Sequence, residues 1–147
     1  MMTSEREHCS AMTQDEKNLI LDLAMERLSE QDFLNRSSID LHGDSAGLGQ
    51  MLDDAQSRKD LAQLECILIL FFRFGGEEKY TFPLCQLLGE DWHIQHENIV
   101  MLLQKIRDPS SVECLYRAAI AHFAYLDYDR RLRIGNKVNI RARCYWH

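Results

Sequence analysis

Two consecutive amphipathic helices, joined by an Asp-Pro pair, constrain the fold of this chain more than any other feature. Four apolar residues of the first helix are spaced i, i+3, i+4 and i+7 and share one face: Ile99, Leu102, Leu103 and Ile106. Asp108 offers a side-chain acceptor to the free N–H groups that open the next helix, and Pro109 occupies a position where a missing N–H costs nothing. The second helix carries its apolar stripe on Val112, Leu115, Tyr116, Ala119, Phe123 and Leu126. The short connection predicts an antiparallel pair, which needs further helices to bury both stripes.

The rest of the chain supplies those helices. Thr13-Gln14-Asp15-Glu16 predicts a capping box and a first helix that runs to about Glu30. A polar stretch with two glycines, 35–47, predicts a loop, and 48–55 predicts a short helix, with a second capping signal at Ser57 and Asp60.

The most apolar run, Cys66–Phe72, allows either a strand or a buried helix. Helical spacing in the residues before it and the absence of a partner strand favour a central helix over Leu61–Phe74, ended by Gly75-Gly76. Pro83 predicts the first turn of a further helix that Gly89 closes. Two hairpins are therefore expected, one of 61–74 with 82–88 and one of 93–107 with 109–125.

These motifs, in this order, resemble the helix–turn–helix units of HEAT repeats. A more specific resemblance rests on four short motifs that follow one another in the sequence: Glu90-Asp91-Trp92-His93, His96-Glu97-Asn98-Ile99-Val100, Asp108-Pro109 and Tyr125-Leu126-Asp127-Tyr128-Asp129. It is similar to a family of small bacterial HEAT-like proteins that includes immunity proteins of contact-dependent inhibition and related polymorphic toxin systems. The resemblance is dense over about the middle third of the chain.

The fold expected from the helical pattern and the resemblance is all-α. We expect a short HEAT-like α-solenoid of antiparallel helix hairpins, forming a single domain over residues 1–129. Residues 130–147 depart from the family pattern, which continues with another amphipathic helix, and form an atypical, irregular C-terminal segment. We interpret this segment as a truncated or altered terminal repeat, or as a basic cap on the end of the solenoid.

Charge is distributed unevenly along the chain. Six basic residues and no acidic residue lie in 130–143, so residues 1–129 hold 11 basic and 23 acidic residues, a net charge of −12. An acidic body repels nucleic acid and anionic membranes and attracts basic partners. We therefore expect a protein partner, and neither nucleic acid nor membrane.

The five cysteines are Cys9, Cys66, Cys85, Cys114 and Cys144. They are odd in number and include no C-x-x-C pair, and four of them fall within helical patterns, which favours buried or inert thiols in a reducing cytosol. No apolar stretch resembles a signal peptide or a membrane span, so a cytoplasmic protein is expected.

The residues predicted to bind the partner form an acidic and aromatic edge: Glu90, Asp91, Trp92, His93, His96, Glu97, Tyr125, Asp127, Tyr128 and Asp129. Tyrosine and tryptophan are frequent anchors of protein interfaces. The alternative for each residue is structural, with Asp91 as a helix N-cap and the histidines bonded to helix ends. His93, His96 and Glu97 do not match the zinc motifs H-E-x-x-H or H-x-x-E-H, so no metal and no cofactor is expected.

No catalytic motif is present, and an enzyme is not expected. The resemblance implies an immunity protein that binds and neutralises a cognate toxin, expected to be basic and a nuclease, by covering its active site or substrate-binding face. The alternative is a general HEAT-like adaptor for protein–protein interaction. A HEAT-like DNA-repair enzyme would need a basic concave face, which the charge distribution disfavours. The sequence sets neither the interface nor the oligomeric state.

Overall fold

The computed structural model describes residues 11–39, 41 and 47–121, and every regular element among them is a helix. Within these ranges the chain forms seven α-helices and two short 3₁₀ helices and no strand, which confirms the all-α class. The chain divides into two compact units between Gly75 and Gly76. The single domain expected over 1–129 stays a prediction.

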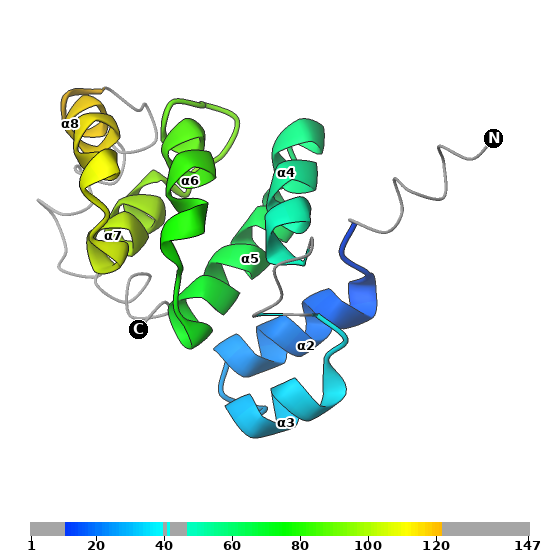
Figure 1. The fold of residues 1–147 in the computed structure, drawn as a ribbon. Coiled ribbons are helices and arrows are strands. Elements are labelled where there is room, and N and C mark those ends of the chain that lie inside the picture. Colours follow the sequence, from blue (N-terminus) through cyan, green and yellow to red (C-terminus); the bar gives the residue numbers. More distant parts are fainter. Residues whose placement is uncertain (1–10, 40, 42–46, 122–147) are drawn as a thin grey trace, which may run out of the picture. The chain divides into compact units, whose positions relative to one another are not determined.

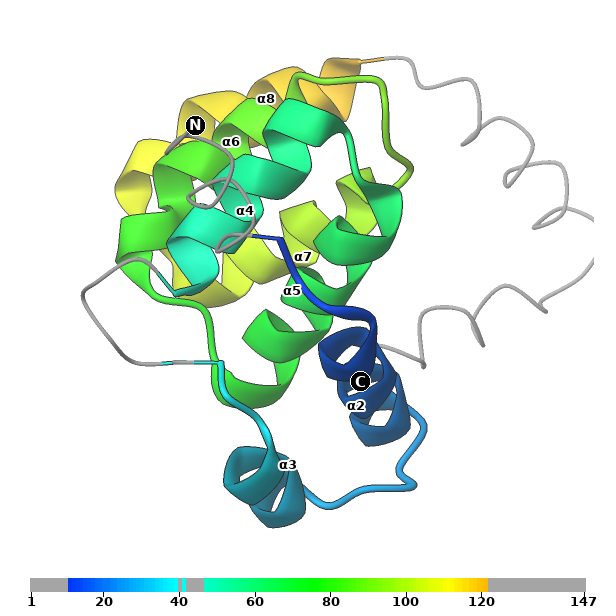
Figure 2. The same ribbon diagram turned by 90° about the vertical axis from the view of Figure 1, so that its right-hand side faces the viewer.

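The first unit contains α2 (Gln14–Ala24), α3 (Glu30–Arg36), α4 (Leu48–Arg58) and α5 (Leu61–Phe74). The capping box is confirmed, because the Thr13 hydroxyl accepts from the Glu16 N–H while the Glu16 carboxylate accepts from the Thr13 N–H. The predicted first helix is too long, however. Glu26 adopts a φ of 60°, which ends α2, and α3 starts after a new cap at Ser29 and turns back beside α2 (Figure 2).

Helix α5 is the core of the first unit and has the predicted bounds, 61–74. The apolar run lies entirely within this helix, so the strand alternative is wrong, and six consecutive residues of it are buried, Cys66–Phe71. Both α4 and α2 pack against it, and the Phe74 ring stacks on Phe33 of α3 at 5.7 Å. Gly75 ends the helix with a φ of 93°, a conformation that favours glycine.

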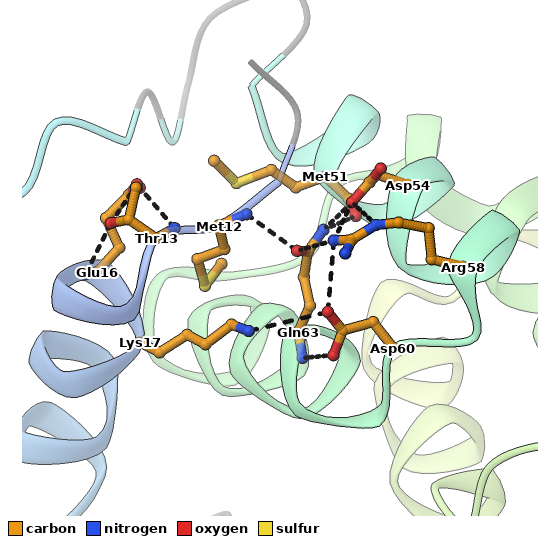
Figure 3. Close-up of polar contacts among 9 residues, drawn as sticks. All are labelled: Met12, Thr13, Glu16, Lys17, Met51, Asp54, Arg58, Asp60 and Gln63. Atoms are coloured by element: carbon orange, nitrogen blue, oxygen red, sulfur yellow. Dashed lines mark hydrogen bonds and ion pairs between the residues drawn. The ribbon is translucent and has the colours of Figure 1, made fainter. Parts of the chain in front are cut away.

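One buried polar side chain, Gln63, links three segments of the first unit (Figure 3). Its carbonyl oxygen accepts from the Met12 N–H at 2.9 Å and from the Arg58 guanidinium at 3.0 Å. Its amide nitrogen donates to the Met51 carbonyl at 2.7 Å and to the Asp54 carboxylate at 3.1 Å. Both the oxygen and the nitrogen of the Gln63 amide are therefore hydrogen-bonded, as buried polar groups require.

The second unit contains η1 (Glu78–Tyr80), α6 (Thr81–Leu88), α7 (His96–Ile106), η2 (Pro109–Ser111) and α8 (Val112–Ile120) (Figure 1). Both α7 and α8 pack mainly against α6. The Asp-Pro turn is confirmed: Asp108 accepts from the Ser110 N–H at 3.0 Å, and Pro109 is the first residue of η2. That hydrogen bond holds the pKa of the Asp108 carboxyl below its usual range.

Two helix ends in the second unit differ from the prediction. Helix α7 starts at His96, three residues later than expected, and its N-cap residue is Gln95, so the assignment of Asp91 as N-cap is wrong. Helix α8 ends at Ile120, because Ala121 adopts extended backbone angles. The hairpin predicted from 93–107 and 109–125 is therefore shorter, and its second helix packs mainly on α6.

A disulfide bond joins Cys85 of α6 to Cys114 of α8, with the two Cα atoms 5.6 Å apart. The expectation of inert thiols is wrong for this pair. The expectation of an inert thiol is met by Cys66, which is buried and not disulfide-bonded. Burial raises the pKa of its thiol to about 12, so the reactive thiolate does not form near neutral pH. Cys9 and Cys144 lie outside the described residues.

Among the described residues, every helix is too short or too polar to cross a membrane. The solenoid arrangement, including the hairpin of 61–74 with 82–88, involves both units and stays a prediction. The C-terminal segment, 130–147, lies outside the described residues.

Candidate functional site

The link between α6 and α7, residues 89–95, and the first turn of α7 contain the described part of the predicted partner-binding edge. The members found here are Glu90, Asp91, Trp92, His93, His96 and Glu97. The other four lie outside the described residues: Tyr125, Asp127, Tyr128 and Asp129. The structure therefore brings together the residues from 90–97, which are close in the sequence, and leaves their proximity to 125–129 untested.

His93 fixes the start of the link to the end of α6. Its side chain is 1% exposed, and Nε2 lies 2.7 Å from the Leu87 carbonyl oxygen. Its other ring nitrogen, Nδ1, accepts from the Gln95 N–H at 3.0 Å. A carbonyl can only accept and a backbone N–H can only donate, so these partners define a neutral ring with its proton on Nε2.

His96 also binds a backbone carbonyl through its imidazole ring, at the start of α7. Its Nε2 lies 2.6 Å from the Glu90 carbonyl oxygen, and its side chain is 2% exposed. The two imidazole rings stack with centroids 4.2 Å apart. Two carbonyls at and beyond the C-terminus of α6 thus accept hydrogen bonds from imidazole N–H groups, and the Leu87 carbonyl also accepts from the Glu90 N–H.

Burial keeps both imidazoles neutral. Desolvation is the main cause that lowers the pKa of His93 and of His96, and it outweighs the opposing effect of their bonds to backbone carbonyls. The neighbouring His93 ring lowers the pKa of His96 further. A proton on Nδ1 of His93 would also break its bond to the Gln95 N–H.

Neither histidine is at the surface, so in this conformation neither can touch a partner directly. Both imidazoles instead hold the link in place, which is the structural alternative considered for them. Trp92 supports the same arrangement: its ring meets His93 edge-on at 5.0 Å, and its indole N–H donates to the Glu90 carboxylate. We therefore assign these side chains to positioning the link.

The outer surface of the link combines charge with apolar area. Asp91 is exposed, and Ile94 is 64% exposed. Glu90 and Trp92, which flank Asp91 in the sequence, are half-buried, and so is Glu97 in the first turn of α7. Ile94 was absent from the predicted edge, because nothing in the sequence marks a single apolar residue as exposed.

In the part of the chain that the structure describes, no three His, Cys, Asp or Glu side chains are placed to hold a metal ion. Both ring nitrogens of His93 are hydrogen-bonded within the chain, so His93 has no lone pair left for a metal.

Comparisons of the chain with protein-family models, curated proteins and solved structures return no match. The fold and the surface chemistry of the described residues, together with the sequence resemblance, are the basis for a functional proposal.

Proposed function

We propose that this chain is an immunity protein that binds and neutralises a basic toxin, with the α6–α7 link as part of the contact surface. The observation that carries the proposal is the pairing of exposed Asp91 and Ile94 on a link that two buried imidazoles hold in place. A surface fixed before binding loses less conformational entropy on association. The resemblance over residues 90–129 supports the same function.

Charge supports a basic partner. Residues 76–121 hold seven acidic and four basic residues, and residues 1–129 have a net charge of −12. Opposite charge on the partner speeds the encounter, and apolar contact slows dissociation. A nuclease is the toxin class that fits best, because its active site must be basic to bind phosphates.

The proposal also places the chain in the cytoplasm, where a nuclease toxin meets its substrate. Disulfides are rare in that compartment. The function should therefore not depend on the Cys85–Cys114 bond, and the double variant Cys85→Ala/Cys114→Ala is expected to protect cells as the natural chain does.

The test is protection of growing cells that produce the toxin domain encoded next to this chain. The natural chain is expected to restore growth and to form a complex whose association slows as salt rises. The double variant Asp91→Lys/Ile94→Asp is expected to lose protection and to bind at least about tenfold more weakly. A matched control is Asp53→Lys, a charge reversal at an exposed position of α4, which is expected to protect.

Two results would reject the proposal. One is unprotected cells in which the natural chain is folded and abundant. The other is a stable complex with a protein that is not a toxin, which would favour the adaptor function.

A further inference from the structure

Helix α8 presents an apolar stripe that nothing in the described residues covers. Val112, Tyr116 and Ile120 are spaced i, i+4 and i+8, which places them on one face, and they are 67%, 66% and 69% exposed. The helix has no fully buried residue over its length. A nine-residue helix is marginal without burial of its apolar face, so an occupant of this stripe would stabilise it.

We propose that the C-terminal segment of the same chain, 122–147, turns back and covers this stripe. The segment starts one residue beyond Ala121, whose extended backbone already leaves the helix axis. Residues 122–131 span up to about 30 Å when extended, whereas a helix of nine residues is only about 14 Å long. The return is therefore within reach.

The sequence of the segment suits this contact. Between 131 and 143 the large apolar residues occupy even positions: Leu132, Ile134, Val138 and Ile140. Five of the six basic residues in 130–143 occupy odd positions: Arg131, Arg133, Lys137, Arg141 and Arg143. An extended chain with this alternation has one apolar edge and one basic edge.

Charge favours the same pairing. The described part of the second unit, 76–121, has a net charge of −3, and on α8 itself the exposed Glu113 is paired with Arg117 at 2.5 Å. An apolar edge on the stripe leaves the basic edge free to face these acidic groups or water.

A second copy of the chain fits this stripe less well. A stable interface between separate chains buries roughly 800 Å² on each partner, which three side chains do not provide. A tethered segment needs far less area, because its effective concentration is on the order of millimolar before any contact forms.

The test is amide hydrogen exchange of the full chain, read on peptides that cover 132–146. Exchange is expected to be at least about tenfold slower than for an unstructured peptide of the same sequence, and independent of protein concentration. The double variant Tyr116→Gln/Ile120→Gln changes exposed positions only, and it is expected to abolish this protection. The matched control Phe82→Gln alters a 72% exposed aromatic residue of α6 and is expected to keep it.

A second variant makes the result independent of α8. Ile134→Gln/Ile140→Gln changes the segment alone and is expected to abolish the protection while the circular dichroism of the described helices stays unchanged. Unprotected amides in the natural chain, or protection that survives Tyr116→Gln/Ile120→Gln, would overturn the proposal. Protection that grows with protein concentration would overturn it in favour of a second copy.

Discussion

The Cys85–Cys114 bond allows a stability prediction with a worked magnitude. The two residues are separated by 29 positions, and closing a loop of that length removes unfolded-state entropy worth about 3.5 kcal/mol at 25 °C. A domain is stable by roughly 5–15 kcal/mol in total, so this one bond is a large part of the whole. The double variant Cys85→Ala/Cys114→Ala should therefore be less stable than the oxidised natural chain by about 3.5 kcal/mol.

The assay is urea unfolding of both proteins in oxidising and reducing buffer. Reductant is expected to lower the midpoint of the natural chain by more than about 1 M and to leave the variant unchanged. Cys66→Ala is the matched control: the cavity it creates lowers stability in both buffers, and its response to reductant stays that of the natural chain. Equal free energies of unfolding for the natural chain in the two buffers, with the bond verified by mass spectrometry, would refute the reasoning.

Three further predictions concern stability. The pKa values of His93 and His96 are lowered in the folded state, so the free energy of unfolding is greatest above about pH 6.5. Below that pH the unfolded chain binds protons that the folded chain does not, and the free energy of unfolding falls by up to about 2.7 kcal/mol per pH unit. A urea midpoint that stays constant between about pH 7 and pH 5.5 would contradict this. Gln63→Leu should lower the free energy of unfolding, measured in urea, by about 2–4 kcal/mol, because it leaves backbone and charged groups without their buried hydrogen-bond partner. A decrease of less than about 1 kcal/mol would mean that water replaces the amide. Gly75→Ala should lower the free energy of unfolding by about 1–3 kcal/mol because φ is 93° there, whereas Gly89→Ala, with the nearest atom 3.5 Å from the new Cβ, should be nearly neutral. Equal effects of the two substitutions would argue against backbone strain.

Local chemistry in the sequence predicted several structural features correctly. The capping box at Thr13, the glycine end of α5 at Gly75 and the Asp108–Pro109 turn each depend on residues within a few positions of one another. The class of the central helix followed from the same kind of information. Such features are predictable because their physical cause lies within a short stretch of sequence.

Features that depend on tertiary contacts were missed. The break after α2 is stabilised by the Arg73 guanidinium, which donates to the Ala24 carbonyl from a helix far along the chain. The start of α7 is set by His93 and His96, whose partners are carbonyls at and beyond the C-terminus of α6. Neither donor can be matched to its acceptor before the fold is known.

For the candidate site, the sequence could not predict which of the residues 90–97 are buried and which are exposed, and the binding role of this stretch stays a prediction. Asp91 is exposed and is not an N-cap, and its place in the partner-binding edge stays a prediction. Ile94 was overlooked, because exposure of a single apolar residue has no sequence signal. The Cys85–Cys114 pair was missed for a related reason: only the packing of α8 on α6 brings the two sulfur atoms together.

The same bond makes residues 85–114 a closed covalent ring, and this ring contains the whole α6–α7 link and all of α7. A protease that cuts once inside the ring would produce a nicked protein whose two pieces remain joined. If helix α7 unfolds locally, the closed ring still limits how far its residues can move from α6. A force that a partner applies to Ile94 would therefore act on both segments that connect Ile94 to the disulfide, 85–94 and 94–114.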